Sequence, residues 1–166
     1  MEIILLILFI FFIISMFSSH NSYYTKNTSS IPDNEFYSFT EYKDGRQYSV
    51  NISTKNFPQI SALNLKNKKH EWYIMGFAKE NKIEVVYSHK GFDNSRVHEI
   101  SDWLMTSIIE EINPTVIIIL HNHPNGVLDA SSQDKISAKD MHNRLLKYNI
   151  KLEEFVCARG NFKKYF

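Results

Sequence analysis

The run from Thr115 to Leu120 (TVIIIL) constrains the fold of this chain more than any other feature of its sequence. Every residue from Val116 to Leu120 is apolar. Successive side chains of a strand point to opposite faces of a sheet, so a strand with this sequence is apolar on both faces. Strands of this kind occur where other elements cover the sheet on both sides. The run therefore predicts a fully buried strand.

The rest of the sequence predicts a mixture of strands and helices. Period-two alternation and turn residues predict strands at 47–52, 71–78, 82–88, 154–158 and 163–166. Apolar residues at helical spacing predict helices at about 53–65, 95–112 and 132–148. The second and third strands form a hairpin around Lys79-Glu80-Asn81. This mixture predicts an α/β or mixed α+β fold, in which helices pack on a mixed sheet.

Two of the predicted helices carry apolar stripes that we expect to face the core. In the helix at 95–112, capped by Asn94 or Ser95, the stripe is Val97, Ile100, Trp103, Leu104 and Ile108. In the helix at 132–148 it is Ile136, Met141 and Leu145.

Residues 1–19 form a separate unit, because residues 3–17 are free of charge and almost entirely apolar. Such a segment is a signal peptide or a signal anchor. Met16 and Phe17 do not suit a cleavage site, which favours an uncleaved single-pass anchor over secretion. The run is shorter than the roughly 20 residues that span a bilayer comfortably. The side of the membrane stays open. Residues 20–45 are polar and rich in turn formers, so we expect a linker before a domain at 46–166.

The composition limits the kinds of partner and of metal site that the chain can have. The chain has 19 basic and 18 acidic residues and a formal net charge of +1. A nucleic-acid binder usually has a basic excess, so we expect no nucleic-acid partner. Cys157 is the only cysteine, which excludes an intrachain disulfide and a zinc site built from thiolates. Any zinc must therefore be bound by histidine and carboxylate.

A candidate metal site follows the buried strand directly, in the sequence HNHPNG from His121 to Gly126. His121 and His123 are two residues apart in extended chain, so both side chains can aim at one metal ion. Ser131 is placed to cap the next helix, and Asp134 is then in its first turn. Three protein ligands leave one tetrahedral position open, as in a catalytic zinc site. Iron or manganese are alternatives, and a plain His-x-His pair on a loop is the alternative without metal.

At these residues the sequence resembles the JAMM, or MPN+, zinc metalloprotease superfamily of JAB domains. Its motif is His-x-His-Pro, seven residues, then Ser-x-x-Asp, and the chain matches every specified position. The RadC-like branch is most similar, because its HNHPSG appears here as HNHPNG, with Asn125 at the serine position. The resemblance spans about residues 47–166. It implies the cytidine-deaminase-like JAMM sandwich, a mixed sheet flanked by helices.

The resemblance also implies the roles of the site residues. His121, His123 and Asp134 would hold one Zn²⁺ per chain. A distant glutamate serves the family as general base, and Glu71 matches it at the start of its strand; Glu84 and Glu99 are weaker alternatives. Ser131 would hydrogen-bond the tetrahedral intermediate. The remaining histidines match no motif position and are expected at the surface or in packing: His89, His98 and His142.

The resulting function hypothesis is a zinc metallopeptidase that hydrolyses a peptide or isopeptide bond. Its substrate would be a peptide or protein, which could include a ubiquitin-like tail. One alternative is a non-catalytic binding module with the JAB/MPN fold. Another is a RadC-like protein associated with DNA, although RadC proteins carry a helix-hairpin-helix region where this chain has an apolar segment. Substrate identity and oligomeric state stay open.

Overall fold

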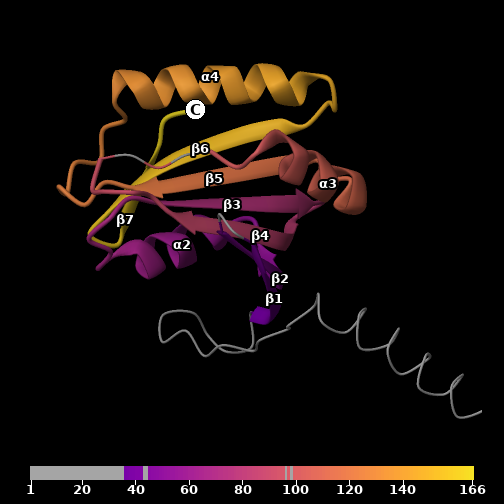
Figure 1. Ribbon diagram of the computed structural model, residues 1–166, viewed down its shortest axis with the longest axis horizontal. Helices are drawn as coiled ribbons and strands as arrows, with labels where there is room; N and C mark the ends of the chain where they lie inside the picture. The colour runs from indigo at the N-terminus through magenta and orange to yellow at the C-terminus, as the bar shows by residue number, and fades with distance from the viewer. Residues whose placement is uncertain (1–35, 43–44, 96, 98) are drawn as a thin grey trace, which may run out of the picture.

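The computed structural model describes residues 36–42, 45–95, 97 and 99–166. The apolar segment at 1–19 and the first part of the expected linker, residues 20–35, lie outside the described residues. Within the described residues the chain forms three helices and one seven-stranded sheet (Figure 1). None of the helices in this part of the chain is both long and apolar enough to cross a membrane.

The sheet is mixed, as the sequence predicted. Along the chain the elements are β1 (Phe36–Tyr42), β2 (Gly45–Ser53), α2 (Phe57–Leu65), β3 (Trp72–Lys79), β4 (Lys82–Lys90), α3 (Asp102–Ile112), β5 (Val116–Asn122), α4 (Ser132–Leu146), β6 (Lys151–Ala158) and β7 (Asn161–Lys164). The strand order is β1-β2-β4-β3-β5-β6-β7. Only β5 and β6 pair in parallel, with α4 as the crossover between them, and every other described pair is antiparallel.

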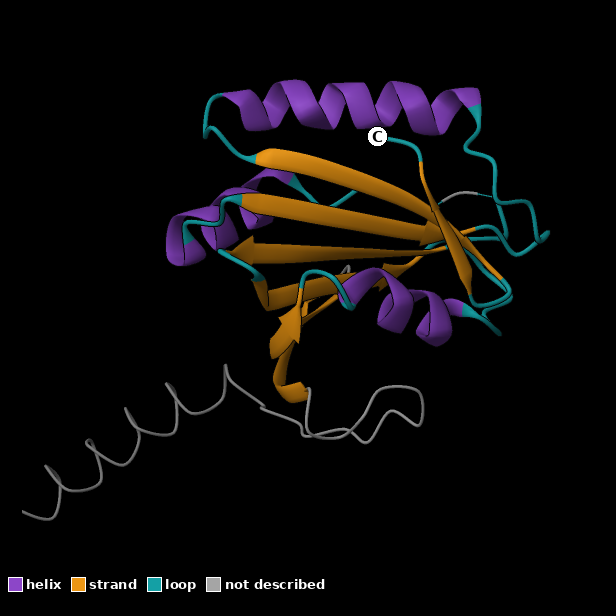
Figure 2. Ribbon diagram, turned by 180° about the vertical axis from the view of Figure 1, so that it is seen from behind, coloured by secondary structure: helices purple, strands orange, loops and turns teal. Residues whose placement is uncertain are grey.

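Strand β5 is buried on both faces, which confirms the prediction from the TVIIIL run. Ile117 and Ile119 belong to the hydrophobic cluster beneath α3 and α4. Ile118 and Leu120 belong to the cluster beneath α2 on the other face. Figures 1 and 2 show helices on both sides of the sheet. The three layers place the carboxyl end of β5 where the chain turns toward α4.

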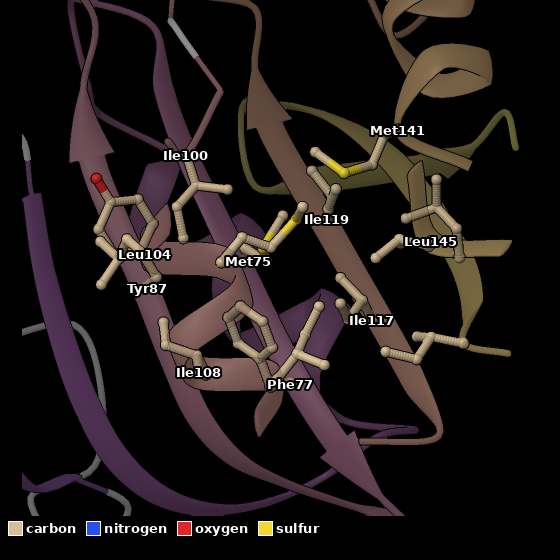
Figure 3. Packing of buried hydrophobic residues seen from close by; sticks show 14 of the residues in the cluster. Met75, Phe77, Tyr87, Ile100, Leu104, Ile108, Ile117, Ile119, Met141 and Leu145 are labelled. Atoms are coloured by element: carbon tan, nitrogen blue, oxygen red, sulfur yellow. The ribbon is translucent and has the colours of Figure 1, made fainter. Parts of the chain in front are cut away.

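The cluster beneath α3 and α4 is the larger of the two (Figure 3). Met75 and Phe77 of β3 meet Ile117 and Ile119 of β5 there, and both helices pack against them. On the opposite face, a methyl group built on Gly76 would approach the Phe57 ring to 2.6 Å. The absence of a side chain at this position of β3 therefore lets α2 pack directly on the strand.

The structure differs from the expectation at 36–42, inside the range 20–45 that the sequence assigned to a linker. These residues form β1, which pairs antiparallel with β2. The sequence FYSFTEY is rich in aromatic residues with high strand propensity. Pairing with β2, rather than local polarity, decides the conformation of these residues. The sheet therefore begins before residue 46.

The predicted start of the helix near residue 95 is wrong, because α3 begins at Asp102 with Ser101 as its N-cap. The amide and hydroxyl of Ser95 both donate to the Asp93 carboxylate, at 2.7 and 2.9 Å, which stabilises a turn instead. The predicted end is confirmed, since Asn113 adopts the left-handed C-cap conformation.

Two residues of the predicted apolar stripes face away from the core. Trp103 is 66% exposed and Ile136 is 54% exposed. Ile136 lies two positions before the buried Ala138, or about 200° around an α-helix, and therefore points to the opposite side. The other members that the stripes predicted to be buried, such as Leu104 and Met141, do pack in the core.

Candidate metal centre

The two motif histidines lie at the carboxyl end of β5. His121 is in the strand and is buried, and His123 follows it. The His123 backbone N–H donates to the Cys157 carbonyl of β6 at 2.8 Å, so the chain remains extended between the histidines. Their side chains therefore point the same way, and their Nε2 atoms are 3.2 Å apart. The convergence predicted from the two-residue spacing is present.

Asp134 completes the group from the first turn of α4. Its Oδ1 lies 3.5 Å from His121 Nε2, and its Oδ2 lies 3.4 Å from His123 Nε2. Ligands bound at about 2.0–2.1 Å to a tetrahedral zinc ion are about 3.3 Å from one another. The three spacings fit that value. His121, His123 and Asp134 form a group that could bind a metal ion, as the sequence predicted.

A backbone contact fixes the tautomer of the neutral His123 ring. Its Nδ1 lies 3.0 Å from the Val127 carbonyl oxygen. A carbonyl only accepts hydrogen bonds, so Nδ1 carries the hydrogen, and in the neutral ring Nε2 has a free lone pair. Metal-binding histidines commonly have their tautomer fixed in this way. The structure thus supplies an observation, beyond residue type, that fits a metal at this position.

Ser131 and Asp134 also form the N-terminal capping box of α4. The Ser131 hydroxyl accepts the Asp134 N–H at 3.1 Å, and Asp134 Oδ2 accepts the Ser131 N–H at 2.6 Å. This pairing satisfies two backbone donors that the helix leaves free. It fixes the Asp134 carboxylate against the turn, so local structure holds the third member of the group. The predicted role of Ser131 as a helix cap is confirmed.

The pKa of Asp134 and the pKa of His123 both shift because these groups lie close together. Partial burial raises the pKa of Asp134, but hydrogen bonds from His121 and His123 outweigh burial and hold this pKa well below its usual range. The hydrogen bond with Asp134 raises the pKa of His123. Each histidine has the Asp134 carboxylate as its partner. A divalent metal ion bound by these groups would take the place of the protons between them.

Glu71 lies just before β3 and lines the same cavity as His121, His123, Ser131 and Asp134, a space of about 650 Å³. Glu71 is 9% exposed. Burial raises its pKa, and the charges of the two histidines partly oppose that effect. Glu71 is therefore a largely buried carboxyl of raised pKa beside the group that could bind a metal ion.

Asn122, the middle residue of the His-Asn-His sequence, fixes the backbone around Glu71. Its Oδ1 accepts the Trp72 N–H at 2.7 Å, and its Nδ2 donates to the His70 carbonyl at 3.1 Å. These contacts bracket Glu71 on both sides. Two more backbone hydrogen bonds, with Asp93 and Gly91, hold Glu71 itself. The sequence gives no local signal for this role, because the partners are 50 and 52 residues away.

The weaker alternatives to Glu71 are placed differently. Glu84 is exposed on β4 and does not line the cavity. Glu99 does line it, but its carboxylate forms an ion pair with Arg144 of α4. Among the histidines expected in packing, His89 is buried and stacks on Tyr73 with ring centroids 5.4 Å apart. His142 contacts the Phe166 ring, and His98 lies outside the described residues.

Three further residues of the cavity were not identified from the sequence. Tyr73 of β3 pairs in register with His121, and Glu154 of β6 pairs with Ile119. Tyr165 donates a hydrogen bond to the Glu154 carboxylate and has its ring edge against His121. All three line the cavity beside the candidate metal ligands. Glu154 gives one signal in the sequence, since it is an acid at an inward position of a buried strand.

Compared with protein-family models and with curated proteins, the chain shows no match to either.

Proposed function

We propose that this chain is a zinc-dependent metallopeptidase with the JAMM-type sandwich fold. The observation that carries the proposal is the convergence of His121 Nε2, His123 Nε2 and the Asp134 carboxylate at zinc-ligand spacing. Glu71 lies in the same cavity. The mixed sheet, with helices on both faces, is compatible with the fold that the motif resemblance implies.

Zinc held by these three ligands would supply Lewis-acid chemistry, lowering the pKa of a water molecule and polarising the carbonyl of the scissile bond. The protein groups around it have separate tasks. Glu71 takes a proton from the attacking water and delivers it to the leaving nitrogen. Ser131 accepts from Asp134 N–H, which leaves its own O–H available to donate to the carbonyl oxygen of the scissile bond.

The two alternatives, a binding module and a DNA-associated protein, require different features of the chain. A binding module with the same fold needs neither the base nor all three ligands. A DNA-associated protein needs basic surface, and the chain carries a net charge of only +1. The complete ligand set, with an acid of raised pKa beside it, supports an enzyme over both.

The first experiment measures bound metal and hydrolysis on the same preparation. The full chain is purified in a mild detergent, because residues 3–17 are apolar and we propose that they anchor the protein in a membrane. Zinc is quantified by elemental mass spectrometry, and hydrolysis is followed with peptide and isopeptide substrates. The variants are Asp134→Asn, Glu71→Gln and, as a control, Asp129→Asn in the exposed loop before α4.

We expect about one zinc per chain in the parent and in Asp129→Asn, with hydrolysis in both. Asp134→Asn should lose zinc and activity together. Glu71→Gln should keep zinc and lose activity by at least about 100-fold, because the base alone is removed. Zinc binding without hydrolysis of any substrate would favour the binding module. Loss of zinc in Glu71→Gln would show that Glu71 is a ligand rather than the base.

A further inference from the structure

The cavity contains a polar group that the metal centre does not use. Tyr73 is 5% exposed and lines the cavity, and its hydroxyl has no hydrogen-bond partner among the residues that the structure describes. Burial raises the pKa of this hydroxyl, and the charges of Glu154 and Glu99 raise it further, so the group stays neutral and lies within their electrostatic reach. Buried polar groups are normally paired, so an unpaired one at a cavity wall points to a missing ligand.

Glu154 lies on the same face of the sheet. Tyr73 pairs with His121 across β3 and β5, and Glu154 pairs with Ile119, two residues before His121. Because side chains two residues apart in a strand share a face, all of these side chains point toward the layer of α3 and α4. Glu154 is 5% exposed, and the partner of its carboxylate in the described residues is the neutral hydroxyl of Tyr165.

The acids that line the cavity differ in the positive groups that face them. Four carboxylates and no lysine or arginine line the cavity among the described residues. Asp134 faces both histidines, and Glu99 pairs with Arg144. Arg144 is also bound by Asp102 at 2.7 Å, so both of its terminal nitrogens are engaged.

Glu71 is the remaining carboxylate, and it already lies in the field of His121 and His123. Glu154 lies in the field of Arg144, but the partner of its carboxylate among the described residues is the neutral Tyr165 hydroxyl. A buried carboxylate without a direct cationic partner is costly, and a bound cation would reduce that cost.

We propose that this side of the cavity binds a cationic side chain, lysine or arginine, close to the scissile bond of the substrate. The inference rests on the proposed peptidase function and names its substrate class. An ammonium or guanidinium group would donate to the Glu154 carboxylate and to the Tyr73 hydroxyl oxygen, two acceptors that an aliphatic side chain leaves unsatisfied. Hydrogen bonds to charged groups are strong enough to favour the cationic substrate by about 10- to 100-fold.

The test uses peptides that differ at one position. Fluorescein-labelled octapeptides carry lysine, arginine, norleucine or glutamate, with the variable residue scanned along an otherwise fixed sequence. Binding to the full chain is measured by fluorescence anisotropy in the presence of a chelator, so that no turnover occurs. Hydrolysis of the same peptides is then measured with zinc added, as kcat/KM. The binding measurement reports the cation site without relying on activity.

Two variants and one matched control assign the effect. Glu154→Gln keeps the shape and a hydrogen-bond acceptor but removes the charge. Tyr73→Phe removes only the unpartnered hydroxyl, so the fold should be retained. Glu153→Gln is the control, because Glu153 is the next residue on β6 but faces the other side of the sheet, where it pairs with Lys151 and Lys164.

We expect the parent and Glu153→Gln to prefer lysine over norleucine at one position by about 10-fold or more, in binding and in kcat/KM. Glu154→Gln should lose the preference, and Tyr73→Phe should reduce it. Equal affinity for all peptides, no measurable binding of any peptide, or a preference that survives Glu154→Gln would overturn the proposal.

The outcomes also separate this inference from the proposed function. Hydrolysis of lysine and norleucine peptides at equal rates would leave the peptidase standing and remove the cation site. A lysine preference in binding that depends on Glu154, with no hydrolysis of any peptide, would leave the cation site standing and remove the peptidase.

Discussion

Replacing Asn122 by aspartate tests whether the middle residue of the His-Asn-His sequence holds the candidate base in place. The Asn122 side chain is 3% exposed and makes two hydrogen bonds of opposite sense. In Asn122→Asp one oxygen can still accept the Trp72 N–H. The other oxygen would face the His70 carbonyl, where two acceptors meet without a hydrogen between them.

The expected loss of stability follows from these contacts. The hydrogen bond to the His70 carbonyl contributes about 1 kcal/mol, and leaving buried polar groups unsatisfied costs about 1–3 kcal/mol more. We therefore expect Asn122→Asp to lower the free energy of unfolding by about 2–4 kcal/mol. Hydrolysis should fall more steeply than the folded fraction, because the backbone on one side of Glu71 is no longer anchored.

The measurement is urea unfolding of the full chain with a chelator present, because bound metal would add its own stabilisation to every variant. Asn125→Asp is the matched control. Asn125 is exposed, and its Oδ1 accepts the Val127 N–H at 3.0 Å, a role that an aspartate oxygen retains. The control should stay within about 0.5 kcal/mol of the parent. Equal unfolding free energies for the two variants would refute the proposed role of Asn122 in holding the backbone on both sides of Glu71.

Two further predictions concern burial. Burial raises the pKa of Glu154 from 4.5 to about 7. The folded state therefore holds this proton more tightly than the unfolded state does. The free energy of unfolding should fall as the pH rises from about 4.5 to 7. With a chelator present, the free energy of unfolding of Glu154→Gln should rise by up to about 3 kcal/mol relative to that of the parent between pH 4.5 and 8. A difference in urea unfolding that does not change with pH would contradict this. Gly76→Ala should lower the free energy of unfolding by about 1–3 kcal/mol, because its methyl group would meet the Phe57 ring, and an unchanged thermal midpoint would show that α2 can shift to make room.

Several features follow from residues that are close in the sequence, and the sequence alone determined them. The burial of β5 on both faces follows from its unbroken apolar run, because alternate residues must face opposite sides. The shared direction of His121 and His123 follows from the same alternation. The capping box of Ser131 and Asp134 needs only one turn of helix. These local rules placed all three candidate metal ligands.

Other features depend on contacts between distant residues, and only the tertiary structure decided them. The strand at 36–42 exists because β2 offers a partner, and the late start of α3 reflects a turn that competes with the helix. Asn122 reaches across about 50 residues to bracket Glu71.

The pairing of β3, β5 and β6 brings Tyr73 and Glu154 to the cavity of the candidate metal ligands. Strand register is a property of pairs of segments, and a one-residue slip would turn every side chain of a strand to the other face. Local periodicity therefore predicts which residues are buried, whereas register decides which of them meet.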